Sequence, residues 1–489
     1  METGNSMRIR ELTEKMSSDP DLSTVNLDVL TCLGYEPVVL EFPNAEKRSV
    51  WEATLKDAKI NLIKHQTTSP ILQNPKFNNQ AARPGLQLCT ATLVPGKRAD
   101  SFPLVWVCAS DKFSGQVSVL NIEGGEVVVE SFSAIGNAAI TAMCTVPPTQ
   151  KFRKRKLKSQ RSCEKERIID MRSSGSEYDS SSDEQSSSGG QTTVWIGNDD
   201  GEVFVVNSTE RIRSRARERL ARLRNSVTSI CAANGNVYVA TYYSTQIQLL
   251  MFKTLADGTW DLENPISISH CCTQPISAMI DVGKRIVLAS GNALYGLYTD
   301  LTGWQKSSEI IPLTDSICVL TLAGGQLYLA SKKSTIIHVV DVFTLRSTNH
   351  FNIAPFVRSQ LAGKEDILRE HKMGCLRITT LTIARSHLWI GTSAGYILST
   401  SLNAAKTQPS PDLNVCEAAH CGPCRIVIPI TSNSHNTLKK QKMSTMTTPS
   451  HQNSNLLILS CGEGNEERKP SQDNDVSDSL NTFILWKCT

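Results

Sequence analysis

The chain has 489 residues, of which 20% are charged and 6% aromatic, and its formal net charge is +4 at pH 7. A chain so close to neutral is neither a general polyanion binder nor an acidic tail, so charge has to be considered segment by segment. Its length predicts two or three domains, unless a repeat lets one domain grow beyond the usual size.

The 15 cysteines are scattered and odd in number, which favours reduced thiols in the cytosol over a disulfide framework. The N-terminus mixes both charge signs and lacks the apolar run of a signal peptide. The best apolar runs, such as 104–109, are as long as a strand and fall short of the roughly 18 to 20 residues that cross a bilayer. We therefore expect a cytoplasmic protein without a transmembrane segment.

The first predicted elements are a strand at 37–42 and a helix at about 45–63, for which Asn44 is a suitable N-cap. The residues expected on one apolar face of the helix are Val50, Leu55, Ala58 and Leu62. The stretch 65–85 that follows is rich in Gln, Asn and Pro, a composition that rarely packs. It predicts a linker and a boundary near residue 80, between an N-terminal segment (1–80) and a larger domain (85–487).

Short β-branched runs with the period of a strand fill the larger domain. Four of them occur close together, at 88–94, 104–109, 116–122 and 126–132, and the same cadence returns along the chain. This predicts an internal repeat of about 40 to 45 residues. The expected units are 88–132, 139–206, 227–269, 276–312, 316–353, 375–401 and 425–487.

The units share an aromatic residue in their second strand. These residues are Trp106, Trp195, Tyr238, Tyr328 and Trp389. A small residue follows two positions later, as at Gly197 and Gly391, and we expect it to end the strand at a tight turn. The next strand then begins at a further glycine, Gly201 or Gly395.

Repeated four-stranded units with two apolar faces predict an all-β propeller of about seven blades, with six or eight as alternatives. A pair of β-sandwiches would not place an aromatic residue at the same point of successive units. The polar stretches 146–191, 431–454 and 462–480 lack apolar content. They are predicted to be disordered loops on this scaffold.

The first of these loops has a basic half (151–167) and an acidic, serine-rich half (173–184). Ser180 and Ser181 each have an acidic residue three positions on, which suits an acid-directed kinase. Solvated filler is nevertheless the preferred interpretation of the whole loop, and regulation by phosphorylation is the alternative.

A second basic segment, 211–224, is predicted to form a solvated helix between strands. It leaves weak peripheral contact with acidic lipid open, whereas the lack of stacking aromatics argues against nucleic acid. Cys416, His420, Cys421 and Cys424 resemble half of a zinc site, but no second ligand pair completes it. A turn at 420–423 before a strand at 425–430 is the preferred interpretation.

The sequence has no phosphate-binding glycine loop, no nucleophile elbow and no metalloprotease helix. We therefore expect no catalytic residue, no cofactor and no metal.

Three runs, 363–372, 375–381 and 388–395, closely resemble the WD40-like propeller of the propeller-bearing Dbl-family Rho guanine-nucleotide exchange factors. The positions that match the family pattern are Trp106, Trp195, Gly197, His371, Lys372, Arg377, Trp389, Gly391 and Gly395. JNK-interacting scaffold proteins are similar across the same propeller, but more weakly and without the His-Lys segment.

Upstream, 41–43, 48–52 and 55–59 resemble the last strand and C-terminal helix of a pleckstrin-homology domain. The catalytic Dbl-homology bundle of the family has no counterpart in this sequence. We therefore expect a partial gene model, a truncated isoform or a diverged paralogue.

The resemblance implies a non-catalytic interaction and regulatory propeller, with protein partners in Rho-family GTPase signalling. Exchange activity and a scaffold role like that of the JNK-interacting proteins are the alternatives.

Overall fold

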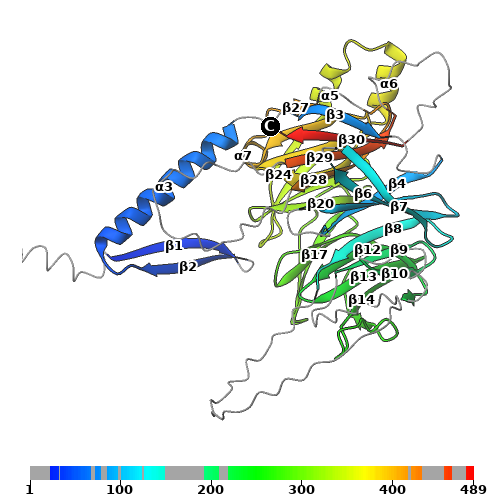
Figure 1. Cartoon of the computed structure of the whole chain (residues 1–489), viewed down its shortest axis with the longest axis horizontal. Helices are drawn as coiled ribbons and strands as arrows, with labels where there is room; N and C mark the ends of the chain where they lie inside the picture. The colour runs from blue at the N-terminus through cyan, green and yellow to red at the C-terminus, as the bar shows by residue number, and fades with distance from the viewer. Residues whose placement is uncertain are drawn as a thin grey trace, which may run out of the picture.

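The computed structural model describes residues 23–31, 34–67, 72–78, 85–96, 101–123, 126–148, 192–208, 219–416, 420–431, 456–464 and 481–488. These residues form one two-stranded sheet with a helix, and seven four-stranded antiparallel sheets (Figure 1). Among the described helices none is long and apolar enough to span a bilayer.

The N-terminal unit pairs β1 (Thr24–Thr31) with β2 (Gly34–Glu41) and continues into α3 (Ala45–Thr67). The predicted strand and helix are confirmed. Asn44 is the N-cap, because its Oδ1 accepts the Lys47 backbone N–H at 2.9 Å. The Trp51 ring lies 5.4 Å from that of Phe42, which joins the helix to the end of β2.

The predicted apolar face of α3 is only partly correct. Leu55 is half-buried, whereas Ala58 is exposed and Val50 is 60% exposed. The half-buried positions of the first turns are instead Ala45, Arg48 and Trp51. One stripe of the helix, which includes Trp51, is thus partly buried, whereas Val50 faces solvent.

Six sheets are each built from four consecutive strands, with the first strand innermost. Blade 1 holds β4 (Gln87–Val94), β5 (Leu104–Ser110), β6 (Gly115–Glu123) and β7 (Glu126–Ala134). Blade 2 holds β8 (Ile140–Val146), β9 (Thr193–Asn198), β10 (Glu202–Asn207) and β11 (Leu220–Arg222). Blade 3 holds β12 (Ser226–Ala233), β13 (Asn236–Tyr243), β14 (Gln246–Phe252) and β15 (Ile266–Ile268).

The next three blades follow the same plan. Blade 4 holds β16 (Ile276–Asp281), β17 (Arg285–Ser290), β18 (Ala293–Tyr298) and β19 (Trp304–Lys306). Blade 5 holds β20 (Ile317–Ala323), β21 (Gln326–Ser331), β22 (Ile336–Asp341) and β23 (Ser347–Asn352). Blade 6 holds β24 (Ile378–Ala384), β25 (His387–Thr392), β26 (Ile397–Ser401) and β27 (Asn414–Val415). The predicted seven units are confirmed, but blades 2 and 6 extend further than expected, to Arg222 and Val415.

Blade 7 is assembled from both ends of the chain. It holds β28 (Cys424–Thr431), β29 (Leu456–Glu463) and β30 (Asn481–Cys488), and its outer strand is β3 (Leu72–Asn78). β3 pairs antiparallel with β30, from Leu72 opposite Cys488 to Asn78 opposite Phe483. The predicted linker is therefore wrong at 72–78, and the propeller begins before the boundary expected near residue 80.

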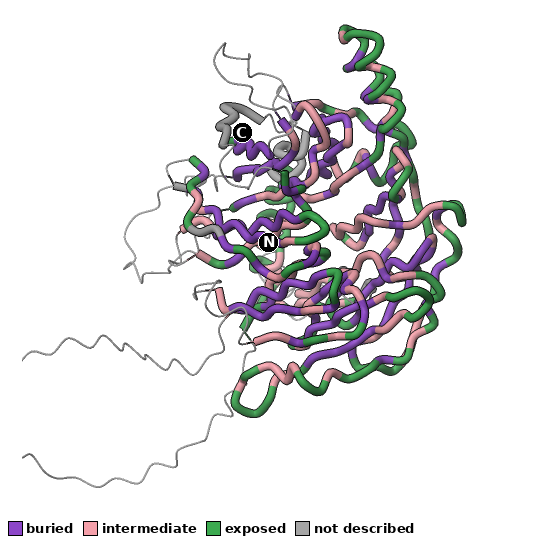
Figure 2. The backbone as a smooth tube through the Cα atoms, turned by 90° about the vertical axis from the view of Figure 1, so that its right-hand side faces the viewer, coloured by how far each residue is buried: buried purple, intermediate pink, exposed green. Residues whose placement is uncertain are grey.

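The blades close into a ring through their innermost strands. Each of these strands contacts the innermost strand of the next blade, and β28 of blade 7 contacts β4 of blade 1. The described buried residues also form seven apolar cores, each shared by two neighbouring blades. Buried segments follow the strands and exposed segments lie mainly at the turns (Figure 2). A blade thus buries both faces only because it has two neighbours.

Three short helices decorate the ring. α5 (Ala354–Gln360) and α6 (Asp366–Gly374) lie between blades 5 and 6, and α7 (Leu402–Thr407) lies between β26 and β27. The helix predicted at 211–224 is wrong at 220–222, where β11 pairs with β10. Pairing at the edge of blade 2 has overridden the helical preference there, and 209–218 lie outside the described residues.

Closure of blade 7 predicts different effects for two N-terminal deletions. Deleting 1–67 removes the hairpin and α3 and should leave the thermal unfolding of the propeller unchanged. Deleting 1–78 also removes β3 and leaves β30 as an unpaired edge. This should cost about 3 kcal/mol or more, at about 0.5–1.5 kcal/mol for each backbone hydrogen bond lost. Differential scanning calorimetry measures the Tm of both deletion variants. Equal Tm values would show that the pairing of β3 with β30 does not stabilise the propeller.

Candidate ligand site at the mouth of the central channel

Every innermost strand carries a β-bulge one or two residues after it begins. The bulged residues are Cys89, Thr141, Thr228, Ser277, Cys318, Thr379 and Arg425. A bulge turns one side chain away from the regular alternation of the strand. The seven bulges therefore place six small polar side chains and one arginine at the end of the ring where the innermost strands begin. We call this end the mouth.

Three of the small members of this set link neighbouring blades together. Thr228 Oγ1 donates a hydrogen bond to Ile276 O in the next blade at 2.6 Å. The hydroxyls of Ser277 and Thr379 make the same type of bond, to the carbonyls of Ile317 and Cys424. Because these bonds cross between blades, they fix the spacing of the innermost strands at the mouth.

Arg425 is the exception because its side chain is charged. It makes an ion pair with Glu463 Oε1, at 2.7 Å from one terminal nitrogen and 3.0 Å from Nε. Both side chains are only about a quarter exposed. Arg425 is thereby held in a defined position at the edge of the mouth.

A cavity of about 620 Å³ opens at the mouth. Its charged lining residues are Asp111, Lys112, Lys332, Arg377 and Arg425. The four cations come from blades 1, 5, 6 and 7. Asp111 also stabilises its own turn, because its Oδ1 accepts hydrogen bonds from the backbone N–H groups of Phe113 and Ser114 at 2.7 Å each. Positive charge therefore dominates this cavity.

Two bulge thiols lie in the same cavity. Desolvation raises the pKa of Cys318 to about 11, although Lys332 and Arg377 pull it down. Desolvation also raises the pKa of Cys89 to about 11, against hydrogen bonding from Ser110 and the charge of Arg425. Both thiols are protonated near pH 7 and are poor nucleophiles and poor metal ligands in that state.

The aromatic residues of the sequence pattern lie in the interior. Trp106, Trp195 and Trp389 are buried on the second strands of blades 1, 2 and 6. Each belongs to the apolar core shared with the following blade. Their role is to fill the space between blades, away from the mouth.

The glycines of the sequence pattern are needed for two different structural reasons. A Cβ at Gly197 would lie 2.5 Å from the Val227 side chain of the next blade, and one at Gly391 would lie 2.5 Å from Thr380. These two glycines therefore serve close packing on an innermost strand, and the expected tight turn is wrong for them. Gly395 does occupy a turn, with φ +92°, and a Cβ there would collide with His420 O.

The His-Lys segment attaches α6 to blade 6. Lys372 is 7% exposed, its Nζ donates to Ala394 O at 3.0 Å, and it lies 5.8 Å from the centre of the Tyr396 ring. His371 is exposed beside it. The Arg377 backbone N–H bonds Ser393 Oγ at 2.9 Å. This anchors Arg377 at the base of its strand while its side chain stays exposed at the mouth.

The resemblance to a zinc half-site has a different basis. His420 is fully buried, with Nδ1 3.2 Å from Gly464 O and Nε2 3.1 Å from Ser460 Oγ. Ser460 Oγ also accepts the Trp486 indole N–H at 3.0 Å. The run 420–423 is the predicted turn before β28. His420 thus belongs to a buried hydrogen-bond network of blade 7.

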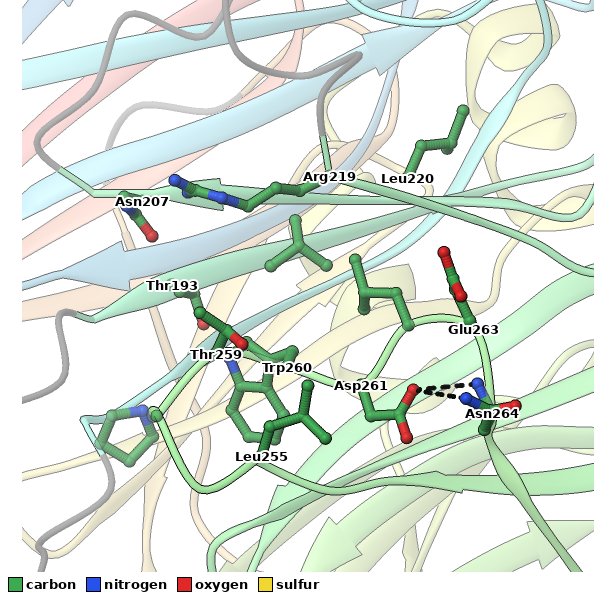
Figure 3. A pocket seen from close by; sticks show the side chains of 14 residues that line it. Thr193, Asn207, Arg219, Leu220, Leu255, Thr259, Trp260, Asp261, Glu263 and Asn264 are labelled. Atoms are coloured by element: carbon green, nitrogen blue, oxygen red, sulfur yellow. Dashed lines mark hydrogen bonds between the residues drawn. The ribbon is translucent and has the colours of Figure 1, made fainter.

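A second and larger cavity, of about 720 Å³, lies between blades 2 and 3. Trp260 lies at its base, in T-shaped contact with Trp195 (ring centroids 5.3 Å apart), and Asp261 holds Asn264 at its side (Figure 3). Its border includes Thr193 and Arg219, next to stretches outside the described residues. Ser180 and Ser181 lie in one of those stretches, so the structure adds nothing to their prediction.

Sequence reasoning missed the mouth. Its one local signal is a small polar residue directly after the first aliphatic residue of six of the seven units, as in Val227-Thr228 or Ile276-Ser277. The most distant of the cations that meet there, Lys112 and Arg425, are 313 residues apart, and only the closed ring brings them together.

A family model described as "WD40 repeated domain" matches residues 99–486. Rho guanine nucleotide exchange factor osg-1 of Caenorhabditis elegans is 60% identical over 494 residues, covering 100% of this chain and 42% of that protein. The resemblance to Rho exchange factors is thereby confirmed.

More distant relatives cover less of the chain. Rho guanine nucleotide exchange factor 17 of Homo sapiens is 32% identical over 213 residues, 43% of this chain and 10% of that protein. JNK-interacting protein 3 of Drosophila melanogaster is 26% identical over 238 residues, 47% of this chain and 18% of that protein. The chain spans less than half the length of each of these relatives.

The His420 network predicts a pH dependence of stability. Burial lowers the pKa of His420 to about 4, against the hydrogen bond to Gly464 that raises it, while an unfolded histidine titrates near 6.5. Below about pH 6.5 the unfolded state binds the extra proton, so stability falls by about 1.4 kcal/mol per pH unit until the folded pKa is reached. His420→Gln should be less stable at pH 7 and lose this slope.

Urea unfolding of both proteins at pH 7 and pH 5 measures the difference. The native chain should lose about 2 kcal/mol more than the variant over this interval. Two other histidines with lowered pKa values, His338 and His387, are present in both proteins, so their contributions cancel. Equal pH dependence would contradict the buried neutral His420.

Proposed function

This chain belongs to the WD40 repeated-domain family, and from that membership we propose that it acts as a non-catalytic protein-interaction and regulatory propeller of a Rho guanine-nucleotide exchange factor-like protein. The observation that carries the proposal is the 60% identity to osg-1, which extends over the whole chain. An identity of that level across every blade supports a shared role for the propeller within such a protein.

The described residues support a role in binding. Cationic side chains from four blades line the mouth. The closed ring holds their backbones in place, which suits recognition of a partner. Its thiols have raised pKa values and are protonated near pH 7, and the mouth lacks an evident base–nucleophile pair among the residues that the structure describes. The described helices are α3, α5, α6 and α7, and they do not assemble into the helical bundle that the family resemblance associates with exchange.

The N-terminal unit supports a second element of the proposal. The hairpin, α3 and the packing of Trp51 on Phe42 fit the end of a pleckstrin-homology domain. Val39 and Val50, 58% and 60% exposed, offer apolar surface on which further strands of such a domain would pack.

The partners we propose are proteins of Rho-family GTPase signalling. None of the thirteen cysteines within the described ranges is in a disulfide, which supports a reducing compartment such as the cytoplasm. A scaffold role like that of JNK-interacting protein 3 is weaker, because the similarity is 26% over 47% of the chain.

A nucleotide-release assay tests the non-catalytic role. The chain is mixed with Rho, Rac or Cdc42 loaded with a fluorescent GDP analogue, and the release rate is compared with that of the GTPase alone. We expect less than a twofold change, as positioned catalytic groups normally contribute factors of a hundred or more. A known exchange factor serves as the positive control. A concentration-dependent acceleration by the chain would show that it is itself an exchange factor.

A further inference from the structure

The mouth presents mainly positive charge. Lys112, Lys332 and Arg377 are exposed, and the described residues include no ion-pair partner for any of them. Arg425 is paired with Glu463, and the remaining carboxylate, Asp111, is bound to the backbone of its own loop. Three cations without an ion-pair partner among the described residues therefore face one cavity, in which Asp111 supplies negative charge.

Their placement favours a compact anion. The three cations come from blades 1, 5 and 6, so they reach the cavity from different sides of the ring. A single carboxylate carries one charge and has two oxygens, whereas a phosphate monoester carries nearly two charges and has three acceptor oxygens. The planar Arg377 side chain is also suited to two parallel bonds with phosphate oxygens.

The surroundings favour a peptide as the carrier of that phosphate. Phe113 follows Lys112 in the β5–β6 turn and is 79% exposed. An exposed aromatic ring beside a charged cavity provides an apolar anchor for the residues that flank a modified side chain. A free phosphate compound would leave this ring without a role.

We propose that the mouth binds a phosphorylated segment of a partner protein, with Lys112, Lys332 and Arg377 contacting the phosphate and Phe113 contacting a flanking apolar residue. This rests on the proposed role as an interaction module and names the chemistry of its ligand. Arg425 acts as a positioning residue, because its ion pair with Glu463 holds the edge of the cavity.

Fluorescence anisotropy with the full chain tests the proposal. The probe is a labelled peptide library with a central phosphoserine and random flanking residues, and its unphosphorylated twin is the comparison. The phosphorylated library should bind at least about tenfold more tightly, as expected for charge-assisted hydrogen bonds. Binding should weaken as salt is raised.

Lys332→Glu combined with Arg377→Glu should weaken phosphopeptide binding by about a hundredfold or more, at about tenfold for each lost contact. Both side chains are exposed, so the fold should be unchanged by circular dichroism. The matched control is Lys284→Glu, an exposed lysine in the β16–β17 turn at the opposite end of the ring. It should bind within about twofold of the native chain.

Equal binding of the two libraries, or native affinity of the double variant, would overturn the proposal. Binding of inositol hexakisphosphate without any phosphopeptide binding would overturn the peptide as carrier. If the chain sediments with phosphatidylserine-containing vesicles and does not bind the phosphopeptide library, the mouth binds a membrane surface and the proposal is wrong. Repeating the nucleotide-release assay on the same proteins separates the two proposals, because failure of phosphopeptide binding leaves the absence of exchange activity intact.

Discussion

The structure depends on one packing constraint: each four-stranded sheet has two apolar faces and can cover them only with its two neighbours. Seven shared cores follow from this, one for every pair of adjacent blades, including the pair formed by blades 7 and 1. An open row of blades would leave two sheet faces in water, which is costly at about 25 cal/mol per Å² of apolar surface. Closure of the ring between blades 7 and 1, where β28 contacts β4, is therefore what makes the fold stable as a whole.

The same closure creates the candidate site. Lys112 lies on blade 1, which meets the neighbouring blades 5 and 6 of Lys332 and Arg377 only around the axis of the ring. At three blade boundaries, bulged residues of the innermost strands bind one blade to the next at the mouth through their hydroxyl groups. The positive charge of the mouth is a property of the closed ring, because no blade contributes more than one of these cations.

Much of the fold was predictable because it is local. Period-2 runs, turn glycines and the repeated aromatic residues identified the blades, and five of those aromatics, such as Trp195 and Trp389, do fill the cores between blades. β3 was not predictable, since Gln, Asn and Pro do not resemble a strand. The structure accommodates them with a register shift between Gln73 and Lys76, which leaves Asn74 and Pro75 out of the pairing.

The site was less predictable than the fold for the same physical reason. A mouth assembled from residues 112, 332 and 377 has no sequence spacing that could reveal it, and the buried His420 network joins residues 40 and 66 positions apart. Short repeats reveal local structure, whereas closure and charge convergence depend on contacts across the whole chain.

Amide hydrogen exchange of the intact chain tests ring closure most directly. We expect the paired amides of β3 and β30 to exchange slowly and together, with protection comparable to that of the outer strands of the other blades. Fast exchange of residues 72–78, as in an unstructured linker, with β30 exchanging as a free edge, would contradict it.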